Sequence, residues 1–161
     1  MFLWFAVLAM VLVAEVFRSP MVDYRIVALG AVLPLIEVVF DRVWFLHTLA
    51  APVVVLAVVM GATTGRRLLR RRALGLPIGL FMHLLLDGTW ATTRLFWWPA
   101  LGFDLSAETV PERAGGWILA IVLELLALAV AVWAVRRYGL DQPDHRQRLL
   151  RTGHLDRSVL P

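Results

Sequence analysis

The chain has 161 residues, of which 60% are hydrophobic and 17% are charged, and its formal net charge is +4. Globular domains average about 45–50% apolar residues, so this composition indicates an integral membrane protein. The basic residues lie in blocks beside apolar runs, which is typical of a membrane edge, and we expect no nucleic-acid partner. The absence of cysteine excludes disulfides, thiolate-ligated zinc and thiol nucleophiles.

Five apolar stretches are predicted to form transmembrane helices. In chain order they cover residues 1–17, 26–40, 43–62, 73–87 and 117–135. Crossing ~30 Å of hydrocarbon takes about 20 helical residues, a length that the third and fifth stretches reach. The second and fourth are shorter and end in acidic residues. This favours either a water-reached site just below the membrane surface or a mismatch that local bilayer thinning absorbs.

The predicted fold class is therefore an all-α, polytopic transmembrane bundle of about five helices. Residues 1–137 form the transmembrane domain, and residues 138–161 form a polar cytoplasmic tail that is mobile or lies on anionic lipid. The first stretch lacks a basic leader and a small-residue cleavage site, so we expect it to be retained rather than removed as a signal peptide.

The distribution of arginine predicts the orientation. The loop between the third and fourth stretches and the C-terminal segment are rich in arginine (Arg66, Arg67, Arg70, Arg71, Arg72, Arg136, Arg137, Arg146, Arg148, Arg151 and Arg157). The positive-inside rule places both in the cytoplasm, with the N-terminus outside. The predicted location is a bacterial-type cytoplasmic (plasma) membrane, with membrane lipids as partners.

Five ionisable residues lie at the predicted outer ends of the second, third and fourth helices: Glu37, Asp41, His47, His83 and Asp87. Ionisable groups at membrane depth are costly and are candidates for function. Without cysteine, imidazole and carboxylate are the usual ligands of Zn²⁺ and similar divalent ions. Two of the helices approach with their C-terminal ends, where the helix dipole favours a cation. The alternative is that the histidines only pack and that the acids mark a solvated boundary.

Two segments resemble the YdjM-like family of membrane-bound metal-dependent hydrolases. The segment from His83 reads HLLLDGTWATTRLFWWPALG and resembles the family's His-x-x-x-Asp signature, with Thr89 in the following turn. The upstream segment, LGAVLPLIEVVFDRVWFLHTLAAP, resembles the first signature, with His47 and Glu37 at its histidine and later acid. The resemblance covers roughly residues 29–102.

Two departures from the family pattern bear on activity. Leu35 stands near the position of the family's first Asp, and the His-Arg pair that precedes the family's Thr-His-Ser is not visible. These losses leave two alternatives open, a single-metal site or a protein that no longer hydrolyses anything.

The resulting functional hypothesis is metal-assisted hydrolysis at the outer membrane face. His47, His83 and Asp87 would hold a divalent metal such as zinc, which lowers the pKa of its water toward ~7. Glu37 or Asp41 would accept the proton. Arg42 or Arg94 would steady a phosphate, although snorkelling to the interface explains either arginine by itself. The resemblance implies a phosphoester or lipid substrate. The alternative function is a non-catalytic membrane scaffold or accessory subunit.

Three further expectations concern packing. Gly61, Gly75 and Gly79 are expected to allow close approach of helices. Pro34, Pro52 and Pro77 are expected to kink or begin helices. Glu124, near the middle of the fifth stretch, is expected to be protonated, to support the ligands, or to pair with a neighbour such as His83.

Overall fold

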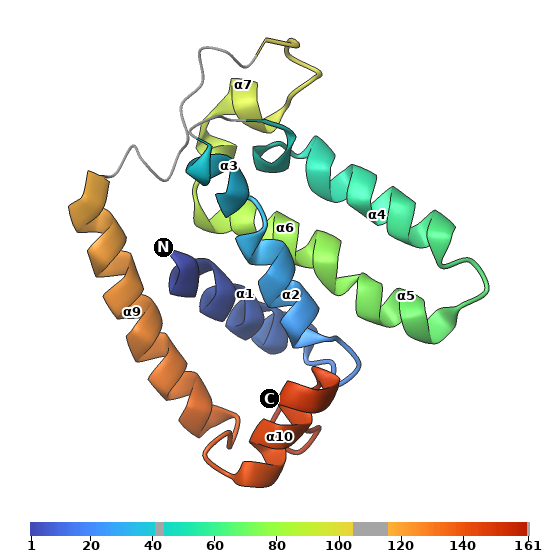
Figure 1. The fold of residues 1–161 in the computed structure, drawn as a ribbon, viewed down its shortest axis with the longest axis vertical. Coiled ribbons are helices and arrows are strands. Elements are labelled where there is room, and N and C mark those ends of the chain that lie inside the picture. The colour runs from blue at the N-terminus through green and yellow to red at the C-terminus, as the bar shows by residue number, and fades with distance from the viewer. Residues whose placement is uncertain (41–43, 105–115, 161) are drawn as a thin grey trace.

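The computed structural model describes residues 1–40, 44–104 and 116–160. Every regular element in these ranges is a helix, which confirms the all-α class (Figure 1). The elements are α1 (Phe2–Phe17), α2 (Tyr24–Val32), α3 (Leu35–Val39), η1 (Phe45–His47), α4 (Ala50–Ala62), α5 (Arg67–Ala73), α6 (Gly75–Leu86), η2 (Thr89–Ala91), α7 (Thr93–Phe96), α9 (Gly116–Arg137) and α10 (Pro143–Thr152). Asp41 and Arg42 lie outside the described residues.

All five apolar stretches coincide with helices, but two of them are broken. The second is divided into α2 and α3 at Pro34, whose ring nitrogen has no hydrogen to donate to the helical ladder. The third begins as the short η1 before α4. Within the described ranges, only α9 is long and apolar enough to cross a membrane, whereas α1 and α4 are apolar but shorter. The prediction of five spans therefore stays a prediction.

The closest helix contact is between α2 and α6, where glycines bring the two backbones together. A Cβ atom on Gly79 would lie 2.1 Å from the Val27 carbonyl oxygen, and one on Gly30 would lie 2.3 Å from that of Leu76. The packing role predicted for Gly75 is also confirmed, since a Cβ there would lie 3.0 Å from the Asp23 carbonyl oxygen. The prediction for Gly61 is wrong, because a Cβ there meets no atom within 4 Å.

The long helix α9 packs along α1 and leaves much of its apolar surface uncovered. Trp117, Ile118 and Leu125 are each more than half exposed. Glu124 accepts a hydrogen bond from the Leu3 backbone N–H at 3.2 Å, so it caps the first turn of α1. Of the partners expected for Glu124, the structure therefore shows a neighbour on α1 rather than His83.

The C-terminal segment was expected to be mobile or to lie on anionic lipid. The first alternative is wrong, because α10 docks against the start of α2 (Figure 1), and the second stays a prediction. Arg25 Nη1 donates to the carbonyls of Leu150 and Arg151 at 2.9 and 3.1 Å. The Tyr24 N–H donates to the Gly153 carbonyl at 2.8 Å. Gly153 ends α10 in the left-handed conformation (φ 78°), and a Cβ on it would overlap the Asp23 carboxylate. Only glycine fits there.

Candidate metal centre

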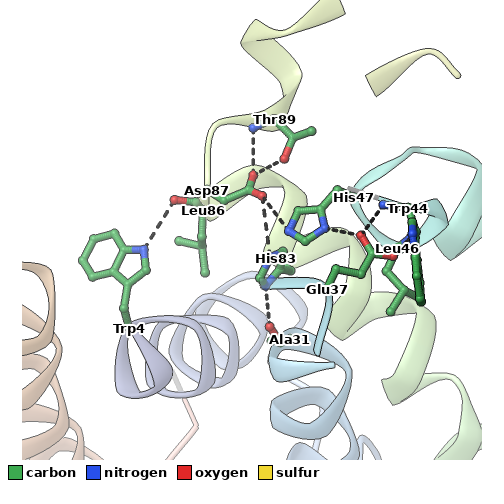
Figure 2. Close-up of polar contacts among 10 residues, drawn as sticks. All are labelled: Trp4, Ala31, Glu37, Trp44, Leu46, His47, His83, Leu86, Asp87 and Thr89. Carbon is green, nitrogen blue, oxygen red and sulfur yellow. Dashed lines mark hydrogen bonds and ion pairs between the residues drawn. The ribbon is translucent and has the colours of Figure 1, made fainter. Parts of the chain in front are cut away.

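The three predicted ligands converge on one buried point. His47 comes from η1, His83 from the last turns of α6, and Asp87 from the residue that ends α6. Asp87 Oδ2 lies 3.6 Å from His83 Nε2 and 3.9 Å from His47 Nε2 (Figure 2). One nitrogen or oxygen atom from each residue falls within 4.8 Å of the others. All three side chains are fully buried.

The imidazole of His47 is oriented by Glu37, the buried acid of α3. Glu37 Oε2 accepts from His47 Nδ1 at 2.6 Å and from the Trp44 N–H at 3.0 Å (Figure 2). Glu37 Oε1 accepts from the Leu46 N–H at 2.7 Å. The two backbone donors lie in the turn that carries His47, so the carboxylate also holds that turn in place. Both of its oxygens are engaged.

The imidazole of His83 is oriented by a backbone carbonyl. His83 Nδ1 lies 2.6 Å from the Ala31 carbonyl oxygen (Figure 2). Ala31 lies in the last turn of α2, where carbonyls have no partner within the helix because the chain breaks at Pro34. The Phe5 ring stacks on His83 with 4.0 Å between the ring centroids. The ring of His83 is therefore held at its edge and on its face.

Asp87 is held by the turn that follows α6. Its Oδ1 accepts from the Thr89 N–H at 2.7 Å and from the Thr89 hydroxyl. Gly88 makes this turn possible, since its φ of 79° lies in the left-handed region. With Oδ1 fixed by Thr89, Oδ2 points toward the two imidazoles (Figure 2).

This arrangement determines which nitrogen of each histidine carries the hydrogen. A carboxylate and a carbonyl only accept hydrogen bonds, so His47 Nδ1 and His83 Nδ1 are the donors. In the neutral imidazoles both Nε2 atoms then present lone pairs toward Asp87 Oδ2. Metal-bound histidines in proteins usually donate the other ring N–H to a carboxylate or a backbone carbonyl in this way.

Distance and charge both fit a divalent cation. The separations of 3.6 and 3.9 Å exceed a hydrogen bond. These two separations, and the 4.8 Å within which all three ligand atoms fall, are wider than the ~3.3 Å between ligand atoms around a tetrahedral ion with bonds of ~2.0–2.1 Å, so the side chains would have to draw together around an ion. The buried carboxylates of Glu37 and Asp87 lie beside the two imidazoles, and a divalent cation bound there would compensate carboxylate charge.

The structure thus brings His47, His83 and Asp87 together and places Glu37 behind His47. Asp41 lies outside the described residues. Arg94 is exposed on α7. Sequence reasoning missed the Ala31 carbonyl and Phe5. A backbone acceptor carries no side-chain signal, although a proline three residues after Ala31 marks the break that frees it.

Comparison with known proteins adds no family assignment. A scan against protein-family models, a search of curated proteins and a search of solved structures each found no match to this chain. The likeness to the YdjM-like family therefore stays an expectation that rests on the two sequence segments described above.

Proposed function

We propose that this protein is a membrane-embedded, metal-dependent hydrolase whose ion is held by His47, His83 and Asp87. The observation that carries this proposal is the pair of histidines, each with Nδ1 tied to a fixed acceptor and with Nε2 directed at one carboxylate oxygen. Packing alone does not require both rings to share this orientation. Two imidazoles and one carboxylate are a common ligand set of catalytic zinc sites.

The residues of this site have separate proposed roles. A divalent ion bound there would supply Lewis acidity toward a phosphoryl oxygen and a water that is nucleophilic at neutral pH. The three ligands would hold that ion, and Glu37 keeps His47 in the ligating orientation. Because both Glu37 oxygens already accept hydrogen bonds, the contacts favour an orienting role over proton acceptance. Asp41, the other proton acceptor predicted from the sequence, lies outside the described residues. A phosphoester on a lipid is the proposed substrate.

Membrane placement is part of the same proposal. It is supported by the exposed apolar side chains of α9 and by the separation of the two polar ends of the helical body. The ligands lie at the end of α6, whereas the arginines of α5 precede its start. A reporter fused after residue 161 is expected to read as cytoplasmic. A periplasmic signal from that fusion contradicts the orientation.

Metal content tests the ligand set directly. Elemental analysis of detergent-purified protein is expected to find about one divalent ion per chain in wild type and in His145→Ala, which removes a histidine of α10. His83→Ala and the more conservative His47→Gln are expected to lose the ion. Circular dichroism and gel filtration establish that each variant is folded. Equal metal content in wild type and in a folded ligand variant refutes the site.

The second candidate is a non-catalytic scaffold in which the same cluster serves only stability. Complete burial of the ligand side chains and the Phe5 ring over His83 favour it. Hydrolysis separates the two functions. A metal-loaded protein that releases phosphate from a lipid phosphoester, with the release lost in His47→Gln, supports the hydrolase. A metal-loaded protein without any such turnover supports the scaffold.

A further inference from the structure

A groove of about 300 Å³ lies at the arginine-rich end of the molecule, opposite the metal centre along α6. Three segments that are distant in the chain form it: the α1–α2 connection, α5, and the residues after α10. Its lining residues are Met21, Leu68, Leu69, Arg71, Arg72 and His154. Cationic and apolar side chains therefore share one groove.

The two arginines of this groove are available to a ligand. Arg71 and Arg72 are exposed, and neither forms an ion pair or a hydrogen bond with any residue in the described part of the chain. Other arginines nearby are engaged: Arg70 contacts Thr63, and Arg25 is paired with Asp23. Guanidinium groups bind phosphate through two parallel hydrogen bonds. The groove thus offers two such groups to an anion.

His154 reaches the groove because the C-terminal segment docks. Its Nδ1 donates to the Val22 carbonyl at 3.0 Å, which positions the ring beside the α1–α2 connection. Gly153, the preceding residue, is held by the Tyr24 N–H. The third polar member of the groove is therefore supplied by tertiary structure and not by α5 itself.

Two further grooves lie between this one and the metal end, each sharing lining residues with the groove before it. A groove of about 320 Å³ shares Met21 and Arg71 with the first and extends to Ile78. A third, of about 330 Å³, shares Ile78 and runs between α4 and α6 as far as Leu49, with only apolar residues in its lining. The lining of the grooves becomes less polar from Arg71 and Arg72 toward Leu49. Helix α6, along which these grooves lie, is ~18 Å long at 1.5 Å per residue.

We propose that these grooves form a binding site for an anionic phospholipid. Its phosphate lies on Arg71 and Arg72 beside His154, and one acyl chain follows the apolar groove between α4 and α6. The exposed Leu68 and Leu69 then face hydrocarbon and the interface rather than water. This inference rests on the proposed membrane placement. It requires neither the metal nor hydrolysis.

Binding of phosphatidylglycerol to the detergent-purified full chain, measured by native mass spectrometry, tests the site. The double variant Arg71→Gln/Arg72→Gln is expected to lower its affinity about 10-fold or more. Arg66→Gln/Arg67→Gln makes the same charge change on exposed arginines outside the groove. This double variant is expected to change the affinity for phosphatidylglycerol by less than about 2-fold. An equal loss in both double variants means diffuse attraction and overturns the proposal.

Three comparison ligands identify which part of the lipid the groove recognises. Phosphatidylcholine is expected to bind at least about 10-fold more weakly than phosphatidylglycerol. Inorganic phosphate and glycerophosphoglycerol, which lack acyl chains, are expected not to displace the lipid at equal concentration. Displacement by either overturns the acyl-chain part and leaves a simple phosphate site. His47→Gln is expected to retain lipid binding, so failure of the metal site is recognised separately.

Discussion

Glu37 Oε2 lies 2.6 Å from His47 Nδ1, so a carboxylate on α3 orients an imidazole ten residues further along the chain. Both groups are buried, and the same carboxylate holds the backbone of the turn that carries the histidine. The candidate centre is therefore built from ligands and from the groups behind them. The Ala31 carbonyl does for His83 what Glu37 does for His47.

Glu37→Gln is expected to weaken metal binding by about 10–100-fold, the usual effect of removing a group that orients a ligand. The amide nitrogen of the new glutamine cannot accept a hydrogen bond from His47 Nδ1 or from the backbone N–H groups that the carboxylate binds. Competition with a chromogenic chelator measures the dissociation constant. Glu15→Gln, which alters an acid that contacts Tyr138 instead, is the matched control. An affinity equal to wild type in Glu37→Gln removes the orienting role.

Metal is expected to stabilise the folded chain. At a free concentration 100 times the dissociation constant, zinc is expected to raise the free energy of unfolding by about 2.7 kcal/mol, because it binds the native site only. Chelation reverses the effect, and His47→Gln abolishes it. Thermal unfolding in detergent, followed by tryptophan fluorescence, provides the measurement. A similar zinc shift in His47→Gln shows that the stabilising ion binds elsewhere.

Gly79→Ala is expected to destabilise the protein by about 1–3 kcal/mol or more, the cost of forcing atoms into a packed contact. The new Cβ would sit 2.1 Å from the Val27 carbonyl oxygen, so α2 and α6 must separate. Gly61→Ala provides the contrast. That position is open, and alanine is expected to stabilise the helix by up to about 1 kcal/mol. Denaturant titration of both variants checks the difference, and equal stabilities disprove the close contact.

Stability is expected to fall at acid pH through Asp23. Burial raises the pKa of this carboxyl, but hydrogen bonds and the charge of Arg25 outweigh burial and leave the pKa below its ordinary value of 3.8. A lowered folded pKa stabilises the native state in full above the unfolded value. That contribution is lost as the pH falls below about 4 and through the folded pKa.

Asp23→Asn isolates this effect. The variant is expected to be less stable than wild type at pH 7 and to lose less stability between pH 5 and pH 3, since the titrating group is absent. Unfolding midpoints across that range make the comparison. A wild-type profile that parallels the variant's shows that other groups carry the acid sensitivity.

The sequence by itself determined the helices and the residues able to bind a metal. Long apolar runs and the position of proline are local features, so all five stretches were located, and Pro34 correctly marked a break. The residue types of His47, His83 and Asp87 restricted the chemistry to hard or borderline divalent ions. These inferences needed no knowledge of which helices are neighbours.

Only the tertiary structure decided how these residues meet. The position of His47 beside His83 depends on Glu37, which binds the His47 ring and nearby backbone, and the ring orientation of His83 depends on the Ala31 carbonyl at the end of α2. The polar composition of the C-terminal segment predicted a tail that is mobile or lies on anionic lipid. It is not mobile, because Arg25 binds backbone carbonyls of α10, which any sequence carries. Contacts between a side chain and a distant backbone group leave no pattern in the sequence, because every residue has the same peptide group to offer.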